Sequence, residues 1–355
     1  MNRLLITEAV EALWGTSNMV SYSRIGDGMI NYSFCIEHKE GHKVFLQQIN
    51  KNVFSRPELI INNLQVIYYA LEQRNSSELI ARPLPFMKGD LFFCDSTGSY
   101  WRASEYIPSK TYHRAERPEQ LIAAVKSIAK FTALLSDMDT RLLEPTLPDF
   151  HNLSLRFKQF IEAAEKGNPE RILESAPLIE ALLDRKQYVT LYEDISNSPG
   201  DFIQRVMHHD AKLSNLLFDL AGEKVVAIAD LDTTMPGFFF SDLGDMVRSM
   251  VASFDENGSD PQNVIALPEA YSLLYENYRL AMQDRLTRTE QSLLHSAGLL
   301  MIYMQALRFL TDHLQEDSYY QIQRPNQNKD RALHQYHLLC SLEVLQKKKY
   351  QFSLR

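Results

Sequence analysis

The chain carries the run VMHHDAKLSNLLFD at residues 206–219 and the run VVAIADLD at residues 225–232. In the first run, Asp210 lies two residues after His208, and Asn215 follows five residues after Asp210. In the second run, Asp230 directly follows a short apolar segment. Phosphoryl transfer needs such a set, because the protein must orient an acceptor hydroxyl and hold Mg²⁺ against the phosphates. The stretch therefore predicts the catalytic core of a phosphoryl transferase.

Each residue type suits one part of this chemistry. Asp210 is the predicted base, because a carboxylate can accept or orient the proton of the acceptor hydroxyl. Asn215 and Asp230 are predicted metal ligands, since Mg²⁺ prefers oxygen donors to imidazole. His208 is expected to brace the loop that carries the base.

A hairpin is predicted between the base and the second metal ligand. Two apolar segments, 216–218 and 225–229, are separated by a polar turn at 219–224, so Asp230 should lie at the hairpin's exit. Asp232 is expected to assist the metal or to orient this loop. Asp242 is expected to anchor the catalytic loop through backbone hydrogen bonds.

Other interpretations of this stretch are weaker. The His-x-Asp spacing alone can arise by chance, and His208 could be a loop histidine without a catalytic role. A transition-metal site made of residues 208–210 would need convergent side chains. Adjacent histidines in an extended loop point apart, and no second His/Cys pair lies nearby in the sequence. The predicted hairpin and the acidic run at 242–245 favour the catalytic interpretation.

Further motifs extend over nearly the whole chain. They are GDGMIN at 26–31, FLQQIN at 45–50 with Val53-Phe54 following, LPDFHN at 147–152, DLDTTMPG at 230–237, and LRFLTD at 307–312 with the later Tyr319. With these motifs the sequence resembles the aminoglycoside phosphotransferase and choline kinase superfamily, and more closely the bacterial N-acetylhexosamine 1-kinases.

The resemblance implies a kinase that uses ATP and Mg²⁺ to phosphorylate a small hydroxylated metabolite. The implied acceptor is the anomeric hydroxyl of N-acetylglucosamine or N-acetylgalactosamine. Arg308 and Tyr319 match positions that contact the sugar in these kinases. The alternatives are another acceptor, such as a different sugar, an amino alcohol or an aminoglycoside, or a nucleotide- or sugar-binding protein without catalysis.

The sequence predicts an α+β, protein-kinase-like fold with two lobes. In the smaller lobe, residues 1–107, alternating apolar residues predict strands at 33–38, 43–47, 90–94 and 100–106, and a helix from Pro57 to about Arg74. Residues 108–355 should form a mostly helical larger lobe. Its expected helices are 118–138, 153–166, 169–191, 268–282, 287–314 and 330–348.

The nucleotide is expected to bind the smaller lobe. Gly26 and Gly28 could let backbone N–H groups approach phosphate oxygens, although they could equally form a tight turn. Main-chain groups of Glu105 and Ile107, where the family joins its lobes, could hydrogen-bond adenine.

One position departs from the kinase pattern. Kinase-like lobes carry a phosphate-binding Lys on a strand, paired with a helix Glu, but the corresponding strand position here is Gln47. Asn62 or Asn63 stands in the helix region, so a neutral Gln–Asn contact is one interpretation. In the other, Lys43 or Lys51 supplies the missing charge. This departure motivates the non-catalytic alternative.

Arg308 and Asp312 are four residues apart on a predicted helix and should share one face. A fork of donors beside an acceptor there could grip sugar hydroxyls and an N-acetyl carbonyl. The simpler interpretation is an ion pair on the helix surface.

Composition agrees with a metabolic enzyme. The 355 residues carry a formal net charge of −8, which gives no general attraction to nucleic acid or to anionic membrane. No apolar run reaches the roughly 18 residues of a membrane span, and the N-terminus lacks a signal-peptide pattern, so a cytoplasmic location is expected. Cys35, Cys94 and Cys340 lack CxxC spacing and are expected to be reduced thiols.

Overall fold

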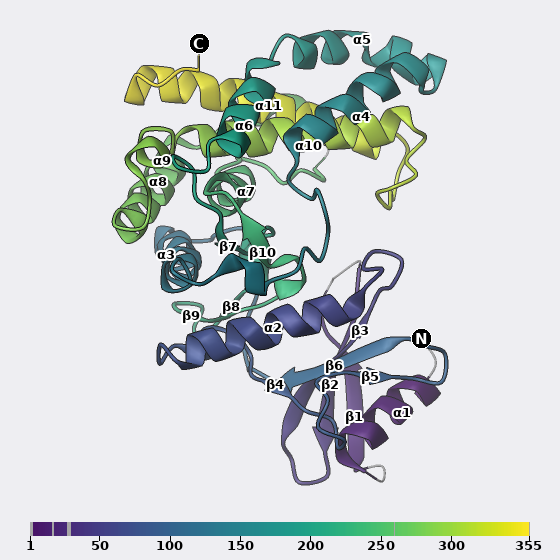
Figure 1. The fold of residues 1–355 in the computed structure, drawn as a ribbon. Coiled ribbons are helices and arrows are strands. Elements are labelled where there is room, and N and C mark those ends of the chain that lie inside the picture. Colours follow the sequence, from purple (N-terminus) through teal and green to yellow (C-terminus); the bar gives the residue numbers. More distant parts are fainter. Residues whose placement is uncertain (1–2, 16–17, 27–29, 259, 355) are drawn as a thin grey trace. The chain divides into compact units, whose positions relative to one another are not determined.

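The computed structural model describes residues 3–15, 18–26, 30–258 and 260–354, and it shows a mixed α+β chain (Figure 1). The N-terminal region holds a β-sheet and the C-terminal region is helical, as the sequence predicts. Contacts divide the chain into two compact units. The first contains 1–111, 134–148 and 215–236, and the second contains 112–133, 149–214 and 237–355.

The first unit differs from the predicted lobe 1–107 because it includes two later segments. The predicted hairpin 216–229 is confirmed, with strands β8 (Leu216–Phe218) and β9 (Val225–Ile228). Ile80 bridges to Ile228 and Lys110 bridges to Phe218, so backbone hydrogen bonds tie this hairpin to the first unit.

The sheet of the first unit has the strand order β1-β2-β3-β6-β4, with β5 paired to β6. Its strands are β1 (Met19–Arg24), β2 (Tyr32–His38), β3 (Lys43–Ile49), β4 (Pro83–Leu84), β5 (Phe93–Cys94) and β6 (Tyr100–Glu105). The β2–β3 hairpin and β6 confirm the alternating pattern. Strand β5 is shorter than predicted, because Leu91 and Phe92 pack into a hydrophobic cluster instead of pairing.

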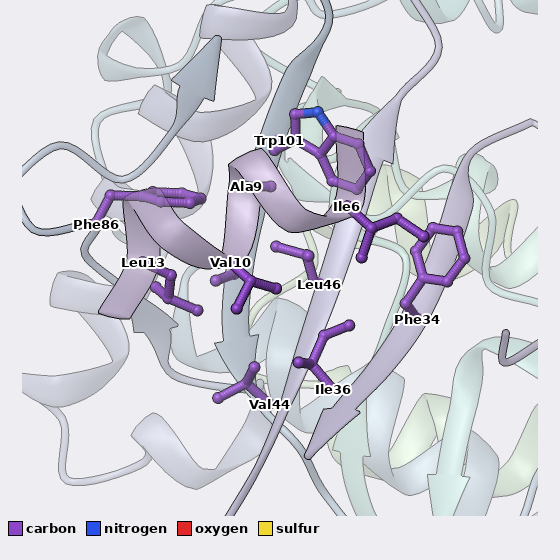
Figure 2. Close-up of a cluster of buried hydrophobic side chains, with 11 residues drawn as sticks. Ile6, Ala9, Val10, Leu13, Phe34, Ile36, Val44, Leu46, Phe86 and Trp101 are labelled. Atoms are coloured by element: carbon purple, nitrogen blue, oxygen red, sulfur yellow. The ribbon is translucent and has the colours of Figure 1, made fainter. Parts of the chain in front are cut away.

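The two faces of this sheet have different chemistry. Helix α1 (Arg3–Trp14) covers one face, and its Ile6 and Val10 pack against Leu46 and Trp101 (Figure 2). Side chains alternate along a strand, so Gln47 and Arg102 point to the other face. Helix α2 (Pro57–Glu72) begins at the predicted Pro57 and buries Ile60 and Ile61 in a second cluster.

Helices dominate the rest of the chain. They are α3 (Pro118–Leu134), α4 (Leu153–Lys166), α5 (Pro169–Leu183), α6 (Gln187–Asn197), α7 (Phe240–Met250), α8 (Pro268–Met282), α9 (Arg288–Ser292), α10 (Ser296–Leu314) and α11 (Gln327–Tyr350). Helix α10 is buried along most of its length and packs against α4, α7 and α11. In the described parts of the chain, no helix is both long and apolar enough to span a bilayer.

Two predicted helices, 169–191 and 287–314, are each two helices in the structure. Tertiary contacts favour both breaks. Arg185 in the first break bonds to Glu343 of α11, and His295 in the second stacks on Tyr275. The sequence interpretation did not predict helix α7; it identified only the acidic run at 242–245 within it. A Cβ at its Gly244 would lie 2.4 Å from the carbonyl oxygen of Ala297, so glycine permits the close approach of α10.

Candidate active site

The predicted catalytic segment follows strand β7 (Arg205–Met207) in the second unit. Asp242, in the first turn of α7, accepts hydrogen bonds from the N–H groups of His208 (2.9 Å) and His209 (2.8 Å). Burial raises the pKa of Asp242, while His208 and these N–H groups act in the opposite direction. His209 has a φ of 65°, a strained conformation for a residue with a side chain. The carboxylate therefore fixes a backbone turn immediately before Asp210.

A lysine that the sequence interpretation missed lies beside the predicted base. Lys212 Nζ donates to Asp210 Oδ2 at 2.8 Å, and the Asp210 N–H donates to His208 Nδ1 at 3.2 Å. Both side chains of the ion pair are partly exposed. The sequence signal that could have predicted this pair is the position of Lys212, two residues after Asp210. The arrangement places a cation next to the carboxylate that would orient an acceptor.

The predicted metal ligands lie together at the open end of the β8–β9 hairpin, in the first unit. Leu216 pairs with Ile228, and the Ala229 N–H donates to the carbonyl oxygen of Asn215 at 2.8 Å. Asp230 follows with φ 60° and ψ 51°, and it is exposed. An amide and a carboxylate are hard oxygen donors, so this set fits a divalent cation such as Mg²⁺.

Asp232, predicted to assist the metal or to orient the loop, is 2% exposed. Its carboxylate accepts a hydrogen bond from Asn31 Nδ2 at 2.6 Å and forms an ion pair with Arg102. Its carbonyl oxygen accepts from the Thr146 hydroxyl at 2.7 Å. Since both carboxylate oxygens are engaged, this geometry favours orientation of the loop over direct metal ligation.

The predicted nucleotide-binding residues Gly26, Glu105 and Ile107 lie at or just beyond the ends of strands β1 and β6. Gly26 follows β1 and has a φ of 75°, whereas Gly28 lies outside the described residues. At the end of β6, the Glu105 N–H donates to the Arg82 carbonyl (3.0 Å), and the Glu105 side chain pairs with the Arg82 guanidinium. The Ile107 carbonyl accepts from the Ser109 hydroxyl at 3.0 Å.

The interpretation of Gln47 as a partner of a helix asparagine is wrong. Gln47 Oε1 accepts from Arg102 Nε at 2.9 Å, and Gln47 Nε2 donates to Ser33 Oγ at 2.8 Å. Asn63 instead bonds backbone groups of Glu144 and Thr234. Of the two alternative lysines, Lys43 is exposed, and Lys51 donates to the Gly98 carbonyl.

The residues predicted to bind the acceptor are in the second unit. The Arg308 guanidinium lies 5.1 Å from the ring centre of Phe150 and 5.6 Å from that of Tyr320, within cation–π distance. Asp312 does not pair with Arg308. It accepts from the N–H groups of Tyr319 (2.7 Å) and Tyr320 (2.9 Å), which favours a role as anchor of that loop. The Tyr319 side chain is 67% exposed.

A buried histidine pair lies next to the predicted base in the sequence and next to Phe150, the ring beside Arg308. His209 Nδ1 lies 3.1 Å from His151 Nδ1. Burial, followed by His209 and Arg308, lowers the pKa of His151 well below its ordinary value, so its imidazole is neutral near pH 7.

Within the described ranges, the one group spaced to hold a metal through His, Asp, Glu or Cys is His38, Glu40 and His42, at the β2–β3 turn.

Comparisons with known proteins agree with this fold. The sequence model of the phosphotransferase enzyme family matches residues 78–280, which is more than half of the chain. The chain therefore belongs to this family. A microcompartment-associated aminopropanol kinase has a similar structure, with 16% identity, a TM-score of 0.67 and coverage of 100% of this chain and 99% of its own.

Two further structures share the fold. An aminoglycoside phosphotransferase from Alicyclobacillus acidocaldarius has 13% identity, a TM-score of 0.64 and coverage of 99% of this chain and 97% of its own. An amicoumacin kinase in complex with AMP-PNP, Ca²⁺ and its substrate has 11% identity, a TM-score of 0.60 and coverage of 98% and 94%. At these identities the likeness shows the fold alone.

Proposed function

We propose that this protein is an ATP- and Mg²⁺-dependent kinase that phosphorylates the anomeric hydroxyl of an N-acetylhexosamine. The observations that carry the kinase assignment are the local geometries of two segments, one in each unit. Asp242 fixes the backbone before Asp210, and a short hairpin holds Asn215 and Asp230 side by side. ATP as the donor also favours a cytoplasmic location.

Each residue has a distinct task in this proposal. Asp210 orients the acceptor hydroxyl and takes its proton as the phosphoryl group is transferred. Asn215 and Asp230 hold the divalent cation, which neutralises phosphate charge when bound. Asp232 keeps the turn after Asp230 in place through Asn31. The nucleotide is bound by residues of the first unit: Gly26, Gly28, Gln47, Glu105 and Ile107.

The acceptor assignment rests on the resemblance of the 307–312 motif and Tyr319 to the N-acetylhexosamine 1-kinases, and on the surroundings of Arg308. Its guanidinium lies within cation–π distance of the rings of Phe150 and Tyr320, and its Nη1 donates to Gln305 Oε1 at 3.3 Å. The remaining N–H groups of this planar fork suit hydroxyl and carbonyl oxygens. An amino alcohol is the second candidate acceptor, because the fold matches an aminopropanol kinase.

A screen for ADP release that depends on the acceptor tests this proposal. The panel contains N-acetylglucosamine, N-acetylgalactosamine, other sugars, amino alcohols and aminoglycosides. We expect an N-acetylhexosamine to support turnover, and phosphorus NMR to show coupling of the product phosphate to the anomeric proton. Activity on an amino alcohol alone would overturn the sugar assignment. Nucleotide binding without turnover on any acceptor would instead favour a non-catalytic protein.

Substitutions of the acceptor residues sharpen the test. A lost charge-assisted hydrogen bond costs about 1.5–3 kcal/mol, so Arg308→Ala should raise the KM for the sugar at least about tenfold and leave the KM for ATP unchanged. Tyr319→Phe should have a smaller effect in the same direction. Arg279→Ala, at an exposed position on α8, is the matched control. An unchanged sugar KM in Arg308→Ala would remove Arg308 from the acceptor site.

A further inference from the structure

Strands β2, β3 and β6 carry a row of polar side chains on the sheet face opposite α1. Ser33 pairs in register with Gln47, and Gln47 pairs in register with Arg102. Side chains on one face of directly opposed residues are neighbours. The row therefore sets a guanidinium directly beside the position where kinase-like lobes carry their phosphate-binding lysine.

The contacts in this row hold Arg102 in one orientation. Its Nε and Nη2 both donate to Gln47 Oε1, and its Nη2 also donates to Asp232. Gln47 is itself fixed by the bond from its Nε2 to Ser33 Oγ. Asn31 fixes the other oxygen of Asp232 and accepts a hydrogen bond from the Asn50 N–H.

One nitrogen of this guanidinium, Nη1, has no acceptor among the described residues. The Arg102 side chain is 11% exposed, and this nitrogen is buried. Burying an unpaired donor of a charged group is costly, so such a group calls for an acceptor. Asp232, the carboxylate paired with Arg102, lies two residues after the proposed metal ligand Asp230.

We propose that Arg102 is the phosphate-binding cation of this kinase, in place of a lysine at position 47. This inference rests on the proposed function, since it assumes that a nucleotide binds the first unit. In this role, Nη1 donates to a phosphate oxygen of the nucleotide. Gln47 and Asp232 hold the guanidinium in the orientation that this contact needs. This role also explains the neutral side chain at position 47, because a lysine there would place a second positive charge next to Arg102 and the two would repel.

Nucleotide binding, measured by calorimetry without any acceptor, tests this role. Arg102→Met should weaken the binding of Mg·ATP at least about tenfold and leave the binding of adenosine within about twofold, because only the phosphates meet the guanidinium. A purely structural role would lower the melting temperature and weaken both ligands alike. Arg74→Met is the matched control, since Arg74 forms an exposed ion pair with Asp137.

A second variant covers the case in which Arg102→Met fails to fold. The double variant Gln47→Lys with Arg102→Gln returns the cation to strand β3 and keeps one positive charge in the row. It should bind Mg·ATP within several-fold of the wild type. Wild-type affinity for Mg·ATP in a folded Arg102→Met, or loss of Mg·ATP binding in a folded double variant, would overturn the role of Arg102 alone. A wild-type protein that binds no nucleotide would overturn the proposed function itself.

Discussion

At the scale of single residues, Asp210 depends on the backbone that presents it. The two N–H groups before it are bonded to Asp242, and a Cβ on Gly237 would lie 2.5 Å from His209 Cε1. Glycine at 237 thus leaves room for the strained His209. The backbone that presents the proposed base is therefore held by Asp242 and by the space that Gly237 leaves.

Replacement of Asp210 tests its role as base. Asp210→Asn should lower turnover by about 10²–10⁴-fold, the usual contribution of a positioned acid–base group, while nucleotide affinity stays nearly intact. Steady-state kinetics and calorimetric binding of Mg·ATP measure the two quantities. A folded variant with wild-type turnover would exclude Asp210 from the mechanism.

At the scale of elements, partly buried ion pairs connect the helices of the second unit. Glu256, in the segment between α7 and α8, accepts hydrogen bonds from Arg248 of α7 and Arg331 of α11, both at 2.6 Å. Burial raises the pKa of Glu256, but the two guanidinium groups outweigh it and hold the pKa at about 2. The carboxylate is therefore worth more to the folded state when ionised.

The pH dependence of unfolding checks this network. A pKa lowered from 4.5 to about 2 gives stability that is present above pH 4.5 and lost as the pH falls through 2. The stability gap between wild type and Glu256→Gln should therefore narrow by about 2 kcal/mol between pH 7 and pH 3. Urea unfolding at each pH measures it.

The exposed Glu162, which pairs with Lys166 on α4, supplies the control through Glu162→Gln. This variant should follow the wild type at every pH, because surface pairs contribute little. An equal gap for Glu256→Gln at pH 7 and pH 3 would contradict the assigned pKa.

At the scale of the whole molecule, ligand binding and folding are linked. A ligand that binds only the folded protein raises its stability, by about 2.7 kcal/mol when its concentration is 100 times the dissociation constant. If Asn215 and Asp230 hold the cation that bridges to the nucleotide, this gain must depend on the metal.

Thermal unfolding gives the corresponding prediction. Mg·ATP should raise the melting temperature by several degrees, and EDTA should remove most of the increase. Asp230→Ala should abolish the Mg²⁺-dependent part, because the cation loses a carboxylate ligand. Asp194→Ala, at an exposed position on α6, is the control. An Asp230→Ala variant with full Mg²⁺ dependence would exclude Asp230 as a metal ligand.

The sequence by itself determined the fold class, most helices and strands, and the hairpin that leads to Asp230. Helical periodicity, strand alternation and turn residues are encoded in short windows, so they can be recognised without tertiary contacts. The proposed base and metal ligands fall within one stretch of 21 residues, 210–230, and were visible for the same reason.

Only the tertiary structure decided which residues surround these groups. Arg102 is 55 residues from Gln47 and 130 from Asp232, and their contact depends on strand register and on a turn that packs back on the sheet. The same holds for the contacts of Arg308 with Phe150 and Tyr320, and for the breaks in the predicted helices. Such contacts join distant parts of the chain, and no local pattern specifies which polar side chains will meet once the apolar faces have packed.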